Sequence, residues 1–316
     1  MKSRFIVLLL VLLMVVPFVG AQEEMACFGF SEADCAVLMS ATANSATVTS
    51  ASFDIDMSLN VTGVPESGPI NAVVTGSGQF MWAEGFDPAT LANMGSMDSF
   101  PGALKVDLNV VANDGTADQN MVLSVVIVDD VIYVLNPEDG KWYGSPISEM
   151  SDGMEQSMGV DDPAEALGAM GMDPAMIESL TALSEVPGFI TTVREGDTFK
   201  VVINLTTLFS APEFMTILQE VGEASGDASM AQMGMILPMI ISEAEISVSE
   251  TVDTGLNVIN GVGLTAHASI DAGMLSGETD MDPIVVDFSF NINLRGINEG
   301  ADIVAPEGAI MEQAAS

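Results

Sequence analysis

The segment that most constrains the fold of this chain runs from Ile284 to Leu294. Its even-numbered positions are all apolar, whereas Asp287 and the odd-numbered positions after it are polar. A period of two over this length predicts a β-strand with one apolar face and one solvated face. Such a long strand needs neighbouring strands beside it and apolar material over it. We therefore expect the rest of the chain to supply a wide sheet and its cover.

Similar alternation recurs along the chain, and short turn sequences such as Asp129-Asp130 separate the segments. The predicted strands are Phe53–Val61, Ile70–Trp82, Leu104–Val110, Met121–Ile127, Val131–Leu135, Lys141–Tyr143, Phe189–Val193, Phe199–Leu205, Ile246–Val248 and Leu256–Ala266. We expect an α+β fold in which a strongly curved antiparallel sheet of about ten strands forms an open half-barrel, with helices covering its concave face. A closed barrel and a two-domain chain divided near residue 150 are the alternatives. Gly76 and Gly78 are expected to allow a bend or bulge.

Helices are predicted in three places. Ser31 and Asp34 have the spacing of a capping box, which predicts a helix from there toward Asn44. The region 147–186 is rich in Met, Ala, Asp and Gly and favours helix over strand. A further helix is expected over about residues 208–221. The Met-rich run 230–241 is then expected to lie in the interior or over a groove.

The first 21 residues have the pattern of an export signal. Lys2 and Arg4 precede an apolar stretch, and Val19-Gly20-Ala21 provides a small-residue cleavage site. The apolar stretch is short for a membrane span of about 20 residues, so an uncleaved anchor is the less favoured alternative. We predict an exported protein, periplasmic or extracellular, at the cell envelope. The expected division is a signal peptide (1–21), a disulfide segment with a helix (22–50), the curved-sheet domain (51–305) and a flexible tail (306–316).

The two cysteines, Cys27 and Cys35, lie close together just after the predicted signal. An even number of cysteines in an exported chain predicts a disulfide. A metal-binding pair is the alternative, but the single histidine, His267, is far away in the sequence. We therefore predict that Cys27 and Cys35 are bonded to each other.

The charge of the chain is strongly negative. Of its seven lysine and arginine residues, Lys2 and Arg4 belong to the predicted signal, so that 45 acidic residues face five basic ones afterwards. This balance excludes binding to a nucleic acid backbone and argues against docking on anionic lipid headgroups. It favours solubility. Loose calcium binding by acidic loops is the alternative, although no segment has the ligand spacing of an EF-hand loop.

No catalytic constellation is evident in the sequence. His267 is expected on the solvated side of its strand, away from any paired nucleophile. Carboxylates are abundant, but no pair stands out as the acid and base of a glycosidase, which stays an open alternative. We therefore predict a protein that is not an enzyme and has no cofactor, metal site or catalytic residue. Asn60 and Asn204 begin glycosylation triplets on predicted strands.

The chain contains 23 methionines, which cluster at 94–97, 150–176 and 230–239. Methionine fills irregular apolar space and adapts to varied partners. The pattern fits either an ordinary Met-rich core or a deformable cavity that holds an acyl chain. For the second interpretation, the predicted cavity residues are Phe53, Ile55, Met57, Leu59, Phe80, Trp82, Leu104, Leu108, Leu180, Met235, Phe288 and Phe290.

Three segments carry a resemblance to a known family. They are the first helix running into Ser50–Met57, the pair Val131–Val134 and Asp139–Tyr143, and the last long strand followed by Ile303–Gly308. The order of elements resembles the LolA-like and LppX/LprG-like carriers of the cell envelope. The resemblance implies an open half-barrel that holds lipid acyl chains between sheet and helices, without catalytic residues.

The chain lacks the cysteine by which the lipid-anchored members of that family are attached, which indicates a soluble form. The partners implied are a lipid or acyl-chain ligand and a transient membrane or envelope-protein partner. The alternative function is a non-catalytic structural or interaction protein of the cell surface with a filled core. The sequence predicts no oligomeric state.

Overall fold

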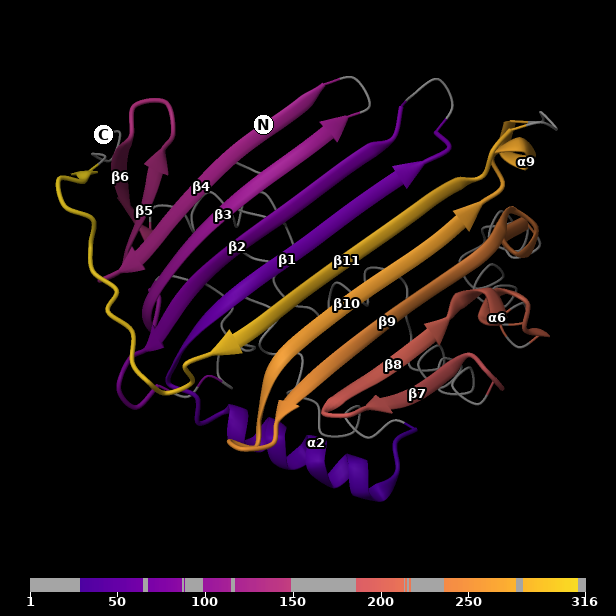
Figure 1. Ribbon diagram of the computed structural model, residues 1–316, viewed down its shortest axis with the longest axis horizontal. Coiled ribbons are helices and arrows are strands. Elements are labelled where there is room, and N and C mark those ends of the chain that lie inside the picture. The colour runs from indigo at the N-terminus through magenta and orange to yellow at the C-terminus, as the bar shows by residue number, and fades with distance from the viewer. Residues whose placement is uncertain are drawn as a thin grey trace.

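Figure 1 shows the computed structural model of the chain, in which one broad sheet dominates. The structure describes residues 29–64, 68–86, 88, 99–114, 117–148, 186–212, 214, 216, 236–276 and 281–311. The predicted signal peptide and nearly all of the Met-rich middle of the chain lie outside these residues.

Twelve strands form a single sheet in the order β12-β6-β5-β4-β3-β2-β1-β11-β10-β9-β8-β7. Each neighbouring pair is antiparallel except β12 and β6, which are parallel. Among the described strands, β12 and β7 are edges that do not pair with each other, so the curved sheet stays open (Figure 1). The predicted α+β fold with an open antiparallel half-barrel is therefore confirmed, and the closed barrel is wrong. The strands are β1 (Ser50–Thr62), β2 (Ile70–Trp82), β3 (Gly102–Asp114), β4 (Asp118–Val128), β5 (Val131–Asn136), β6 (Lys141–Pro146), β7 (Ile190–Glu195), β8 (Thr198–Asn204), β9 (Ile241–Asp253), β10 (Val258–Ile270), β11 (Ile284–Arg295) and β12 (Ile310–Met311).

The alternating segment Ile284–Leu294 forms β11, which lies near the middle of the sheet. It pairs with β10 on one side and with β1 on the other. In the β1 pairing, Ile55 faces Ile292 and Met57 faces Phe290, so the apolar positions of the two strands share one face. Arg295 binds Asp54 on the opposite face through two hydrogen bonds of 2.8 and 2.9 Å. The first strand of the chain and the last long one thus meet near the centre of the sheet.

Gly76 and Gly78 make room for large side chains within a regular stretch of β2. The register from β1 through β2 to β3 is unbroken, so the pair does not form a bulge. A Cβ atom at Gly78 would lie 2.3 Å from Cζ of Phe53, and one at Gly76 would lie 2.4 Å from Cδ2 of Leu108. Glycine is needed here because the rings and methyl groups of neighbouring strands occupy the space above it.

The sheet has its register shifts between β9 and β10 instead. One lies between Ile259 and Gly261, and another between Ser269 and Ile270. The first shift inserts one residue and moves Ile259, rather than Val258, into the row that continues with Val262. The expected placement of Leu256 and Val258 in that row is therefore wrong, and Leu256 lies in the turn with 54% of its surface exposed.

The predicted turn between β4 and β5 is confirmed. Asp129 and Asp130 have φ angles of 53° and 58°. Two consecutive residues with positive φ are typical of the type I′ hairpin turn, and Asp tolerates this conformation better than most residues. The Asp130 carboxylate also accepts a hydrogen bond of 3.0 Å from the backbone N–H of Phe100. This bond anchors the ring of Phe100, which is buried in the main core.

The first predicted helix is confirmed as α2 (Glu32–Ser45). Ser31 is its N-cap, and the backbone N–H of Asp34 donates to Ser31 Oγ at 3.2 Å. Leu38 and Ala41 are buried and pack with Phe199 of β8 and Val252 of β9. The helix lies across the ends of β8, β9 and β10 (Figure 1). Cys35 lies in α2 without a free thiol, but Cys27 is outside the described residues, so their pairing stays a prediction.

Two short helices follow strands of the sheet, α6 (Leu205–Phe209) and α9 (Ala272–Ser276), and the described residues 147–148, 212, 214, 216 and 236–240 are also helical. Much of the helix expected over about residues 208–221 lies outside the described residues. α6 precedes it and ends at Phe209; Asn204 is its N-cap and accepts a hydrogen bond from Thr207 N. In the described end of the Met-rich run, Ile236 and Met239 are 43% and 57% exposed, so this end does not lie in the interior. None of the helices that the structure describes has the length and hydrophobicity needed to span a membrane.

Candidate functional site

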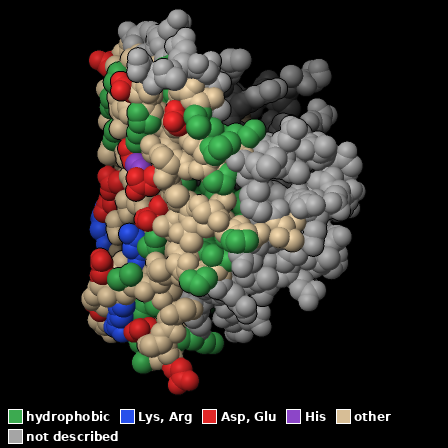
Figure 2. Space-filling view, turned by 90° about the vertical axis from the view of Figure 1, so that its right-hand side faces the viewer, with side chains coloured by type: hydrophobic (Ala, Val, Ile, Leu, Met, Phe, Trp, Pro, Cys, Tyr) green, Lys and Arg blue, Asp and Glu red, His purple; other side chains and the backbone are tan. Residues whose placement is uncertain are grey.

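The candidate site is the apolar face of the sheet, the face that carries the even-numbered side chains of β11. Because the register is continuous, rows of apolar residues cross several strands. One row runs from Leu264 through Phe290, Met57 and Val74 to Val110, and the next runs from Ala266 through Phe288 and Leu59 to Ala72. Figure 2 shows the consequence edge-on: charged side chains line one side of the sheet and hydrophobic ones gather behind them.

The apolar face is not equally covered along its length. Toward the α2 end its side chains are buried: Ile55 is 2% exposed and Phe290 4%. Phe100 and Trp82, whose rings are 5.7 Å apart, belong to the same core. Further along the strands the apolar side chains of the same face become partly exposed. We call this part the open region, and its members are Met57, Leu59, Val61, Val201, Ile203, Ile246, Val248, Val262, Leu264, Ala266, Val286 and Phe288.

The predicted cavity residues gather on this one face. Four of them are fully buried in the main core, and five more are partly buried against it. Leu59 pairs with Phe288 in the open region. The buried ones are Phe53, Ile55, Leu108 and Phe290, and the partly buried ones are Met57, Phe80, Trp82, Leu104 and Phe288. Leu180 and Met235 lie outside the described residues, and a ligand role for the whole set stays a proposal.

One residue of the face was missed by the sequence analysis. Glu250 of β9 faces Phe199 of β8 and Val262 of β10, which places a carboxyl group on the apolar side of the sheet. Burial raises the pKa of this carboxyl above its ordinary value. The signal was present in the sequence, because the alternation that places Ile246 and Val248 on the apolar face continues to Glu250 and Val252.

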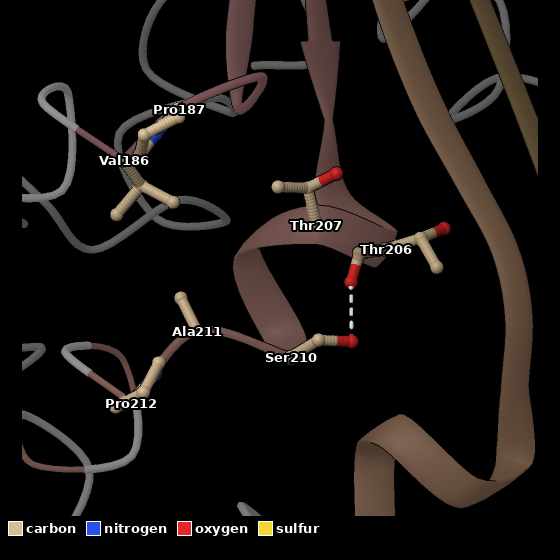
Figure 3. Close-up of a pocket in the computed structure, with 7 residues that line it drawn as sticks. All are labelled: Val186, Pro187, Thr206, Thr207, Ser210, Ala211 and Pro212. Atoms are coloured by element: carbon tan, nitrogen blue, oxygen red, sulfur yellow. Dashed lines mark hydrogen bonds between the residues drawn. The ribbon is translucent and has the colours of Figure 1, made fainter.

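A surface pocket of about 530 Å³ lies beside α6, at the end of β8 (Figure 3). It is lined by Val186, Pro187, Thr206, Thr207, Ser210, Ala211 and Pro212. Ser210 Oγ donates to the carbonyl oxygen of Thr206 at 2.9 Å, and Thr206 Oγ1 accepts from the backbone N–H of Ala244 at 2.6 Å. None of these lining residues is titratable at neutral pH, so the pocket offers no acid, base or charged group for catalysis.

The opposite face of the sheet is polar and carries His267, as expected from the alternation of its strand. His267 Nδ1 and Asp287 Oδ1 are 2.7 Å apart, and Nε2 lies 3.7 Å from Glu243. The hydrogen bond with Asp287 is the main cause that raises the pKa of His267, and the negative charges of Asp287, Glu243 and Glu245 add to it. Within the described ranges, no group of three or more His, Cys, Asp or Glu residues is arranged to hold a metal ion.

The contacts of His267 predict a pH-dependent contribution to stability. The folded-state pKa lies above the unfolded value of 6.5, so the contribution is complete below that value and is lost as the pH rises through the folded pKa. The side chain is partly exposed, so solvent weakens the effect. We expect the melting-temperature difference between the parent chain and His267→Gln to be largest near pH 5 and to vanish at high pH. Asp287→Asn should flatten the same profile, and a difference that grows with pH would contradict this assignment.

Comparison with known proteins does not assign the chain to a family. No family model matches it, and no curated protein matches it. Several solved structures align over most of the chain, among them the following two. A structure titled "Lipid-protein interactions in lipovitellin" is 8% identical with a TM-score of 0.28, and LprF from Mycobacterium bovis is 12% identical with a TM-score of 0.24. The alignments cover 82% and 86% of this chain, but only 26% of the lipovitellin chain against 95% of LprF. TM-scores this low carry no argument about family or function.

Proposed function

We propose that this protein is a binding protein that holds a lipid, or a ligand bearing an acyl chain, against the open region of the sheet. The observation that carries the proposal is the change in burial along one apolar face. On β1 and β11 the apolar side chains are buried at Ile55 and Phe290. On the same face of the same strands they are partly exposed at Leu59 and Phe288. A folded protein gains little by extending apolar rows beyond its core, unless something apolar is to be bound there.

The energetics of such binding are favourable. Each methylene group that is removed from water contributes about 0.8 kcal/mol. An acyl chain with ten buried methylenes would thus contribute about 8 kcal/mol before the entropic costs of binding, which reduce the net affinity. The open region offers branched, aromatic and thioether side chains for this contact. It requires neither catalysis nor a cofactor, and we propose a role without either.

The N-terminal sequence supports an exported location for this binding protein, with residues 1–21 as its signal peptide. The resemblance of three sequence segments to LolA-like and LppX/LprG-like carriers is in line with the same proposal. A carrier in the cell envelope would receive its ligand from a membrane or envelope-protein partner and pass it on.

The buried end of the apolar face favours a second candidate function, that of a structural or interaction protein. Val125, Ile55 and Leu108 are 1–2% exposed, which shows a well-packed core at that end. If the core is filled over the full length of the sheet, the protein is a structural or interaction protein of the cell surface. The two functions differ in whether the open region accepts a guest.

The decisive experiment compares two single-charge variants that differ only in the face they alter. Leu59→Asp places a carboxylate in the open region, whereas Asn60→Asp places the same charge on the polar face of the same strand. We expect the parent chain to take up an uncharged fluorescent probe with an acyl chain, with about one probe per chain by native mass spectrometry. Leu59→Asp should weaken that uptake at least tenfold and Asn60→Asp should not. Both variants should first be shown to be folded by circular dichroism.

Two results would overturn the proposal. One is a parent chain that is purified free of ligand and takes up no probe, which would favour the structural role. The other is equal loss of binding in both variants, which would show that an added carboxylate on either face, and not the open region, controls uptake.

A further inference from the structure

Glu250 lies at the inner end of the open region, where the apolar face passes under α2. Its neighbours on the same face are apolar in every direction. Val248 and Val252 flank it along β9, and Phe199 and Val262 face it across the sheet. Val248 is partly exposed, whereas Val252 and Phe199 are buried under the helix. A carboxyl group therefore marks the boundary between the open region and the closed end.

This carboxyl has no partner among the described residues. The nearest cation on this face by register is Arg194, which faces Phe199 in the β7–β8 pair. Its guanidinium is already engaged: Nη1 binds Asp34 Oδ1 at 2.6 Å, and Cζ stacks 4.8 Å from the centre of the Phe199 ring. Burial without a partner raises the pKa of Glu250, so the group costs folding free energy that an apolar residue would not.

The position of Glu250 on β9 suits a role in binding a ligand, which would offset the folding free energy lost by burying its carboxyl. Glu250 lies four positions after Ile246, so the distance between them along β9 is roughly 14 Å at 3.4 Å per residue. Val248, the side chain between them on this face, is apolar and partly exposed. A ligand lying along β9 and β10 would place its chain over Val248, Leu264 and Ile246, and its end at Glu250.

We propose that Glu250 anchors the polar end of the ligand, and that this end is a hydrogen-bond donor, an amine above all or a hydroxyl, and not a phosphate or a carboxylate. The inference rests on the proposed binding function and names the ligand class. An ionised carboxylate only accepts hydrogen bonds, and a protonated one brings no positive charge with which to bind an anion. The net charge of −38 acts in the same direction, because it repels anions from the whole surface.

The test uses a series of probes with one chain length and different ends. Dodecylamine, dodecanol, dodecanoate and dodecyl phosphate, each below its critical micelle concentration, compete with an uncharged fluorescent probe for the purified full chain. We expect the amine to bind at least tenfold more tightly than the two anions. The affinity of the alcohol should lie between that of the amine and those of the anions.

Two matched variants then locate the preference. Glu250→Gln keeps the shape of the side chain and should reduce the preference for the amine to less than threefold. Glu245→Gln removes the same charge from the polar face of the same strand and should leave the preference unchanged. Binding of the uncharged probe should persist in both.

The outcomes separate this inference from the function on which it rests. Equal binding of all four probes, tighter binding of the anions, or equal loss of preference in Glu250→Gln and Glu245→Gln would overturn the role of Glu250 alone. A parent chain that binds none of the probes, including the uncharged one, would overturn the binding function and this inference together.

Discussion

Replacing Gly78 by valine is expected to destabilise the fold by about 3 kcal/mol or more. The first added atom would lie 2.3 Å from Cζ of Phe53 and 2.4 Å from the backbone oxygen of Lys105. The ring could turn away only by leaving the core, and the backbone oxygen cannot move without breaking the pairing of β2 with β3. The measurement is the free energy of unfolding in urea, followed by circular dichroism.

Two further variants make this expectation specific. Gly255→Ala, in the turn after β9, brings its Cβ to within 3.2 Å of a single flexible carboxylate oxygen of Asp253 and should change stability by less than about 1 kcal/mol. Adding Phe53→Ala to Gly78→Val should not restore the fold, because the contact with the Lys105 oxygen remains and a core ring is lost. A Gly78→Val chain with the urea midpoint of the parent would show that the sheet is looser here than described.

Two phenylalanines on one strand should respond to truncation in different ways. Phe290→Ala empties a fully buried site and is expected to cost about 3–5 kcal/mol of stability. Phe288→Ala removes a partly exposed ring two residues earlier on the same face and should cost about 1–2 kcal/mol. The second variant should nevertheless weaken acyl-chain binding severalfold, because Phe288 belongs to the open region. Urea unfolding and probe titration measure the two effects separately.

The contrast between these two variants tests the division of the apolar face. Similar stability losses for Phe288→Ala and Phe290→Ala would mean that the core extends over the open region and is filled there. Normal probe binding by a folded Phe288→Ala chain would remove that ring from the site.

Much of the fold was predictable from the sequence because alternation is a local property. The pattern in Ile284–Leu294 identifies a strand and the face that each side chain occupies, and the structure agrees with both. Alternation does not show which strand lies beside another in the sheet. That β11 lies beside β1 depends on how the two halves of the sheet meet, and no short segment encodes that contact.

The errors have physical causes of the same kind. Gly76 and Gly78 suggest a bulge when only β2 is considered, but they serve the side chains of the adjacent strands. Because of the register shift before Gly261, Val258 lies on the face opposite to Val262. A single inserted residue is hard to detect in a sequence pattern of period two. Glu250 was missed because a carboxylate seems to end an apolar row, although the row continues to Val252.

The neighbouring positions of β1 and β11 have a consequence for the order in which the fold can form. The hydrogen bonds between Asp54 and Arg295 join residues that are 241 positions apart. Apart from β12, each half of the sheet consists of antiparallel pairs between strands that are consecutive in the sequence and can assemble early, whereas the seam between the halves must close a very long loop. Until it closes, β1 and β11 are both exposed edges with long apolar rows, which are prone to pair with other chains. We therefore expect seam closure to be the slow step of refolding, and its yield to fall as protein concentration rises.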